Sequence, residues 1–221
     1  MKISKAVFYI TMFLPLPVTL AALVFLPDQI PAHYGFDNQV TRWGSKYETL
    51  ILPLMTILLG LIMIGVIKLS SKMEPSEEKR EKNEKMCIIT GIFSFLLFNV
   101  MNLFFLYTGF RKVETLSEVP VDMMQLLFIL IGVFMIVIGC IMPGIPMNSL
   151  IGLRTSWSMR NEAVWQKCQR FGGMLSIAAG VLMIIACFFT DGFICFTCSM
   201  GILAVMVSVD VIHTYKISKN S

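Results

Sequence analysis

Residues 123–142 read MMQLLFILIGVFMIVIGCIM and contain no Asp, Glu, Lys or Arg. A helix needs about 20 apolar residues to cross the hydrocarbon core of a bilayer. Five further apolar runs of similar character lie at roughly 6–26, 49–67, 87–109, 172–190 and 193–213. The sequence therefore predicts an all-α, polytopic integral membrane protein with six transmembrane helices.

The composition supports this class. Of the 221 residues, 56% are hydrophobic and 14% are charged, whereas soluble domains carry about 25% charged residues. Among the charged residues, only Asp210 falls inside one of the six runs. The net charge of +4 is modest, and no basic stretch is interleaved with aromatic residues. These features argue against a soluble enzyme, a disordered chain and direct nucleic-acid binding, and they make membrane lipids the expected partners.

The basic residues predict the orientation. Lys and Arg gather at the N-terminus, between the second and third runs, between the fourth and fifth runs and at the C-terminus. The opposite side carries only Arg42, Lys46, Arg111 and Lys112. Loops rich in Lys and Arg remain in the cytoplasm, so both termini are expected there.

Local signals mark several helix ends. Ser45 and Glu48 form an S-x-x-E capping box that opens the second span. Ser76 can cap a third helix that extends well into the cytoplasm, because acidic residues follow it directly. Pro15 and Pro17 lie in the middle of the first span and predict a kink.

The outer loop 27–49 is the longest segment expected outside the cell. Its Pro, Gly and Asp-Asn residues predict ordered turns rather than a helix. His33 could bind a metal with Asp28 and Asp37, but the spacing matches no usual ligand pattern, so an ordinary turn histidine, no metal and no cofactor are expected. The candidate residues for extracellular recognition are Pro31, His33, Tyr34, Asp37, Trp43 and Lys46.

The cytoplasmic loop 143–171 forms a second candidate region, called the elbow below. Ser158 is expected to cap a short amphipathic cytoplasmic helix before the fifth span, with Glu162 in its first turn. Arg154 is expected to pair with Glu162 or with the last carbonyls of the fourth span. A plain interfacial connector and a folded site both remain open. The candidate site residues are Asn148, Gly152, Arg154, Thr155, Trp157, Glu162 and Trp165.

Four polar residues fall within or near the ends of the spans. Asn99 and Asn102 share one helix face, where they either join helices or line a substrate path. Asp210 and His213 lie one turn apart near the inner end of the sixth span. An ionisable residue inside a membrane is a functional candidate, although this pair is close enough to the boundary to pair locally.

These two loops resemble segments of the bacterial SdpI family. The stretch LPDQIPAHYGFDNQVTRWGSK resembles the family's N-terminal module through Pro27, Pro31, His33, Ser45 and Lys46. The stretch NSLIGLRTSWSMRNEAVW resembles its C-terminal signature through Asn148, Gly152, Arg154, Thr155, Trp157 and Trp165. This chain departs from the pattern at Ser156, which replaces a usual Pro, at Ser158, which replaces Thr, and at Gln169, which replaces a common His.

The resemblance implies a function that hydropathy alone does not. The family's namesake is an immunity protein that protects a cell from its own secreted membrane-active peptide, and it is reported to hold a transcriptional repressor at the membrane. We therefore expect a non-enzymatic immunity protein of the bacterial plasma membrane, with a toxin peptide and a cytoplasmic repressor as possible partners. A membrane signalling receptor without immunity activity and a transporter of a small molecule or lipid are the alternatives.

The expected organisation has three segments. Residues 1–70 form a two-helix module around the outer loop, and residues 71–122 form a charged cytoplasmic loop with the third helix. Residues 123–221 form an SdpI-like three-helix module that contains the elbow.

Overall fold

The computed structural model describes residues 2–35, 37–74, 76–119, 122–148 and 152–219. Within these ranges, six helical segments are long and apolar enough to cross a membrane: Ser4–Leu23, Lys46–Lys72, Glu77–Arg111, Met123–Gly144, Glu162–Phe189 and Gly192–Lys219. The six-span helical architecture expected from hydropathy is therefore confirmed.

The first span is broken as its prolines predict. Helix α1 (Lys2–Phe13) ends one residue before α2 (Pro15–Leu23), and Leu14 forms the break between them. Pro15 and Pro17 cannot donate backbone hydrogen bonds to the preceding turn, so the regular helical pattern is interrupted at this point.

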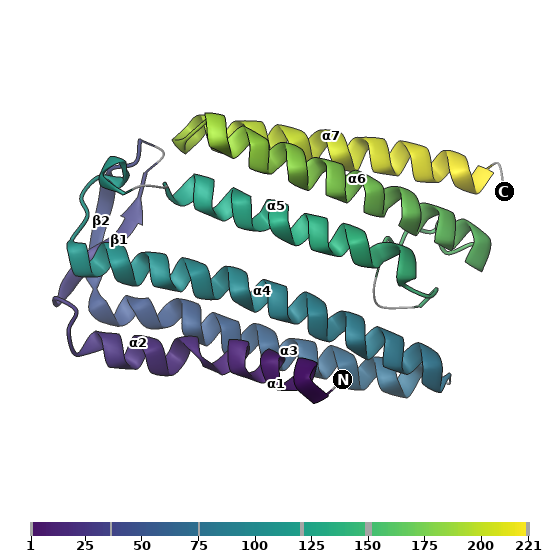
Figure 1. Ribbon diagram of the computed structural model, residues 1–221, viewed down its shortest axis with the longest axis horizontal. Helices are drawn as coiled ribbons and strands as arrows, with labels where there is room; N and C mark the ends of the chain where they lie inside the picture. Colours follow the sequence, from purple (N-terminus) through teal and green to yellow (C-terminus); the bar gives the residue numbers. More distant parts are fainter. Residues whose placement is uncertain (1, 36, 75, 120–121, 149–151, 220–221) are drawn as a thin grey trace.

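The long helices run back and forth along one axis (Figure 1). They are α3 (Ile51–Met73), α4 (Glu77–Arg111), α5 (Met123–Ile141), α6 (Glu162–Phe189) and α7 (Gly192–Lys219). Figure 1 shows α1 to α4 grouped on one side and α5 to α7 on the other, with both chain ends at the same end of the bundle. The shared position of the termini agrees with an even number of spans.

The end of the bundle opposite the termini carries a small β-hairpin. Strand β1 (Gln29–Tyr34) pairs antiparallel with β2 (Val40–Ser45), and a 3-10 helix η1 (Lys46–Leu50) leads into α3. The sequence predicted ordered turns here and no strands. The irregular pairing beside His33, where the register shifts on both sides, breaks the simple alternation that would have revealed the strands.

Helices α5 and α6 approach each other through glycines. A Cβ atom on Gly132 would lie 2.8 Å from the backbone oxygen of Gly180, and one on Gly139 would lie 2.5 Å from that of Gly173. Small residues allow membrane helices to pack backbone against backbone. These two contacts, one at the middle of α5 and one near its C-terminal end, hold α5 and α6 together.

The flanks of the bundle are strongly apolar. Phe189 is 83% exposed, and Val24, Phe25 and Phe188 are each more than 70% exposed. Water would not tolerate so many exposed large hydrophobic side chains, whereas lipid tails solvate them. The surface therefore supports a bilayer as the surroundings of this protein.

The elbow corrects one expectation. In the described part of the elbow, no separate amphipathic helix precedes the fifth span, because α6 is continuous from Glu162 to Phe189. The cap is Asn161, whose side chain accepts a hydrogen bond from the Val164 amide, and not Ser158. The expected amphipathic stripe is instead the first turns of α6, where Val164 and Cys168 are fully buried.

Candidate functional site

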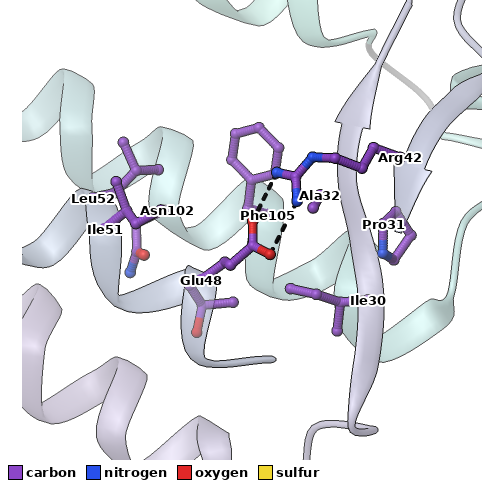
Figure 2. A pocket seen from close by; sticks show the side chains of 10 residues that line it. Ile30, Pro31, Ala32, Arg42, Glu48, Ile51, Leu52, Asn102 and Phe105 are labelled. Carbon is purple, nitrogen blue, oxygen red and sulfur yellow. Dashed lines mark hydrogen bonds and ion pairs between the residues drawn. The ribbon is translucent and has the colours of Figure 1, made fainter. Parts of the chain in front are cut away.

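A pocket opens beneath the hairpin, between β1, η1, α3 and α4 (Figure 2). It has a volume of about 160 Å³ and is mostly apolar, with Ile30, Leu52 and Phe105 among its walls. We call it the outer pocket, because it lies at the end of the bundle expected to face outward.

An ion pair borders the outer pocket. The guanidinium of Arg42 donates from Nη1 to Glu48 Oε1 at 3.0 Å and from Nη2 to Oε2 at 2.7 Å. This two-point pairing fixes both side chains in one plane. Glu48 also raises the pKa of Arg42, chiefly through these hydrogen bonds. The pair thus presents a charged but electrically balanced edge to anything that enters.

Local sequence explains why Glu48 reaches this position. Its Oε1 also accepts a hydrogen bond from the Ser45 amide at 3.2 Å, completing the capping box expected from the sequence. A Cβ atom on Gly44 would collide with Oε1 of Glu48, so glycine leaves the room that the carboxylate needs. The helix cap and the edge of the pocket are therefore one structure.

Asn102 supplies a polar group to the same pocket. Its Nδ2 donates to Thr19 Oγ1 at 2.9 Å, which joins α4 to α2. Its Oδ1 is buried and has no hydrogen-bond partner among the described residues. A buried acceptor without a partner is unfavourable. The outer pocket therefore combines apolar walls with one unsatisfied acceptor.

The other candidate residues of the outer loop do not line the pocket. His33 Nδ1 forms a hydrogen bond with Thr41 Oγ1 at 2.6 Å across the hairpin, and Asp37 Oδ1 accepts from the Gln39 amide in the turn. Lys46 pairs with Asp28 at 2.9 Å, while Trp43 remains partly exposed. Of the six candidates, only Pro31 borders the pocket.

The second outer loop holds the hairpin in place. Tyr34 is buried, and its hydroxyl donates to the backbone oxygen of Val113 at 2.9 Å. Burial raises the pKa of Tyr34, which keeps the hydroxyl protonated as a donor. Gln39 pairs with Thr115 through both backbone and side chain. Sequence analysis assigned no site to this loop, and its role depends on long-range contacts that no local pattern displays.

At the opposite end, the elbow folds around Gln169 of α6. The side-chain oxygen of Gln169 accepts from the Leu153 amide, and its Nε2 donates to the Leu153 oxygen, both at 3.1 Å. Gly152 has a φ of +102°, and a Cβ there would lie 2.9 Å from the Gln169 amide. Only glycine suits this backbone and this contact. Gln169, the departure from the family pattern, is thus a central support of the elbow.

Short hydrogen bonds shape the rest of the motif. Ser158 Oγ donates to the Leu153 oxygen at 2.8 Å and accepts from the Thr155 amide at 2.9 Å. Thr155 Oγ1 accepts in turn from the Ser158 amide. These reciprocal bonds close a turn between Thr155 and Ser158, which is the role that Ser158 has in place of the expected helix cap.

Both tryptophans of the motif are anchored through their indole nitrogens. Trp165 is fully buried, and its Nε1 donates to the Ile145 oxygen at 2.9 Å. Trp157 Nε1 donates to Thr214 Oγ1 of α7 at 3.2 Å, and its ring meets Tyr215 edge to face. Asn148 donates to the Pro146 oxygen at 2.8 Å. The elbow is therefore a folded unit tied to both α6 and α7.

The expected pairing of Arg154 with Glu162 is wrong. Glu162 Oε1 instead accepts from Lys79 Nζ of α4 at 3.2 Å. Arg154 is exposed and makes no hydrogen bond or ion pair with any described residue. Arg160 makes a different link, because its Nη1 donates to the Ser218 oxygen near the end of α7 at 2.7 Å.

The polar residues of the spans separate into two kinds. Asn99 donates to the Thr11 and Phe95 oxygens at 2.9 and 2.7 Å, so it joins α4 to α1 as expected of a helix–helix contact. His213 is exposed and stacks on Phe171 at 3.9 Å between ring centres. Asp210 is only 5% exposed, and its Oδ1 has no hydrogen-bond partner in the described structure.

Family models of known proteins match the two segments of the chain that contain the elbow and the hairpin. Residues 144–215, which include the elbow, α6 and most of α7, match the model of the SdpI/YfhL protein family. This match supports membership of the SdpI/YfhL family. Residues 10–57, which include the hairpin, match a separate model described as a domain of unknown function, DUF1648. The N-terminal resemblance is thus to a module with its own family model.

A curated relative covers most of the chain. Immunity protein SdpI of Bacillus subtilis (strain 168) is 24% identical over 194 residues, which is 87% of this chain and 86% of the relative. No solved structure matches this chain. The SdpI/YfhL relationship and the six apolar spans together make this a multi-pass bacterial membrane protein.

Proposed function

We propose that this SdpI/YfhL family member is an immunity protein that protects its host bacterium from a secreted membrane-active peptide, recognised at the outer pocket. The observation that carries the proposal is the unsatisfied Oδ1 of Asn102 in an apolar pocket under the hairpin. The name of its relative, immunity protein SdpI, supports the same function.

The chemistry of the pocket limits what enters it. Apolar walls favour an aliphatic or aromatic side chain, and Asn102 Oδ1 favours a hydrogen-bond donor on that side chain. A volume of about 160 Å³ suits one side chain rather than a whole peptide. We therefore propose that one anchoring side chain of the peptide enters the pocket, while the Arg42–Glu48 pair contacts the peptide outside it.

The test compares two asparagines of the same helix. Asn102→Ala removes the acceptor from the pocket, whereas Asn99→Ala removes a helix–helix contact one turn away that does not border it. Each variant is produced in a sensitive strain, which is challenged with membrane-active peptides purified from the culture medium of the host bacterium. Asn102→Ala should lower the peptide concentration that the strain survives by at least about fivefold, the loss of affinity expected for one hydrogen bond.

The controls separate recognition from folding. The amount of each variant in the membrane is measured beside resistance, and Asn99→Ala should retain resistance in proportion to that amount. Exchanging the charges in Arg42→Glu with Glu48→Arg should restore part of what Arg42→Glu alone removes. Full resistance of Asn102→Ala at a normal amount would contradict recognition at the outer pocket.

A relay to a cytoplasmic repressor is a second proposal, supported by α4. This one helix carries Asn102 at the outer pocket and Lys79, which pairs with Glu162 beside the elbow. A shift of α4 on peptide binding would therefore reach the elbow directly. The test measures whether the repressor moves to the membrane when cells are challenged with the peptide. The Lys79→Ala variant should lose this recruitment and keep its resistance.

A further inference from the structure

A second cavity lies at the end of the bundle opposite the outer pocket. It has a volume of about 360 Å³ and is lined by α4, α5, α6, α7 and the Gly152–Leu153 segment of the elbow. This size falls in the range of small-molecule sites. We call it the inner cavity, because the basic loops predict that this end faces the cytoplasm.

One buried carboxylate lies in the wall of the inner cavity. Asp210 borders it together with Thr90 of α4 and Ser176 of α6, and the remaining wall is apolar or glycine. Among the described residues, the lining includes no Lys, Arg or His. The nearby titratable groups on the packed helices are Cys168 of α6 and His213 of α7, and the His213 ring is exposed and stacked on Phe171.

The fold leaves space around the Asp210 carboxylate but supplies no hydrogen-bond donor to its Oδ1. A Cβ atom on Gly172 would lie 3.3 Å from Asp210 Oδ1 and 3.0 Å from the Met142 methyl group, so glycine keeps that side open. Thr214 Oγ1 donates to the backbone oxygen of Asp210 and leaves the carboxylate free. Burying a carboxylate without a hydrogen-bond partner is costly, which indicates that a ligand supplies one.

We propose that the inner cavity binds a small apolar molecule carrying one ammonium group, which pairs with Asp210. The ammonium group supplies the missing donor and the missing positive charge, and the apolar body fills the rest of the cavity. A bare metal ion fits poorly, because such ions take about six oxygen ligands, and no group of three or more metal-ligating side chains occurs in the described residues. This inference does not depend on the outer pocket or on immunity.

Trp165 provides a built-in reporter. Its indole packs in one cluster with Met142 and Ile145, which both line the inner cavity. In a Trp43→Phe, Trp157→Phe background of the full chain in lipid nanodiscs, Trp165 is the remaining tryptophan of the three. Benzylamine is then titrated against benzyl alcohol, which has the same ring and a neutral donor.

The expected result is a saturable change of Trp165 fluorescence with benzylamine, at concentrations at least about tenfold lower than with benzyl alcohol. Asp210→Asn keeps the size of the side chain and should abolish this preference. Asp191→Asn changes an exposed carboxylate at the far end of the same helix pair and should preserve it. The elution profile in size-exclusion chromatography checks that each variant is folded.

A second variant tests the location independently of the charge. Thr90→Phe fills the cavity from α4 and leaves Asp210 intact, so it should weaken the binding of both ligands. Retained binding in Thr90→Phe would place the ligand elsewhere. Equal affinity for benzylamine in the parent and in Asp210→Asn, or no saturable response in the parent, would overturn the proposal.

Discussion

The outer pocket and the inner cavity share one design and differ in charge. Each lies at one end of α4, and each combines apolar walls with a buried oxygen that lacks a partner. In the outer pocket this oxygen belongs to a neutral amide, and the nearby charges of Arg42 and Glu48 cancel. In the inner cavity it belongs to a carboxylate, and none of the described lining residues is basic.

This difference separates two kinds of selectivity. A neutral acceptor discriminates by hydrogen bonding and shape, so the outer pocket should accept any apolar side chain with a donor in the right place. An unpaired carboxylate discriminates by charge. We therefore expect peptide recognition outside to depend little on salt, whereas ligand binding inside should require a positive charge.

The largest expected effect disrupts the packing of α5 against α6 and leaves α1 to α4 folded. A Cβ atom at position 139 would lie 2.5 Å from the Gly173 backbone oxygen, so the side chain introduced by Gly139→Leu would clash with α6. Forcing α5 and α6 apart should cost about 3 kcal/mol of stability or more. In a chain whose other five cysteines are replaced, the reactivity of buried Cys168 towards a thiol dye, followed during heating in detergent, measures the loss.

Gly65→Leu is the matched control for that change. Gly65 lies in α3, and a Cβ atom there would meet nothing within 4 Å. Its melting profile should remain that of the parent. If both leucine variants were equally stable, the glycine contacts would not hold α5 and α6 together.

The next largest effect tests whether Gln169 holds the elbow in place as a wall of the inner cavity. Gln169→Leu removes both hydrogen bonds to Leu153 and leaves its amide and carbonyl without these partners, at a cost of about 2 kcal/mol. The exposed Gln166→Leu, on the same helix, should cost little. The rate of protease cleavage in the elbow, measured on protein embedded in nanodiscs, reports how far the elbow has detached from α6. Equal cleavage of the two variants would show that Gln169 does not hold the elbow in place.

The smallest effect concerns Arg154. Its side chain is exposed and makes no hydrogen bond or ion pair with the described part of the chain, so Arg154→Lys should change the melting temperature by less than the equivalent of about 0.5 kcal/mol. Arg160→Lys should cost more, because the guanidinium of Arg160 bonds the end of α7. Greater destabilisation by Arg154→Lys than by Arg160→Lys would reverse this assignment.

The sequence predicted what depends on local patterns. Hydropathy located the six spans, and the capping box of Ser45 and Glu48 and the cap at Ser76 both formed as expected. These features depend on residues within a few positions of one another. The two asparagines were expected either to join helices or to line a substrate path, and both bond a neighbouring helix, since an amide in a span has few other partners.

The sequence did not predict what depends on distant contacts. The hairpin was missed because its pairing is irregular, and Arg42 was missed because its bond to Glu48 requires that hairpin. Gln169 looked like a lost histidine, yet its amide supplies both a donor and an acceptor to Leu153. Motif residues in the elbow proved mainly to build its shape, whereas the unsatisfied atoms lie on α4 and α7.

The placement of the two sites on opposite sides of the membrane is the central claim, and thiol labelling tests it most directly. Asp37→Cys in the hairpin turn and Ser156→Cys in the elbow are each introduced into a chain without its native cysteines, which serves as the unlabelled control. A membrane-impermeant maleimide should label Asp37→Cys in intact cells and Ser156→Cys only after the membrane is permeabilised. Labelling of Ser156→Cys, and not of Asp37→Cys, in intact cells would contradict the account.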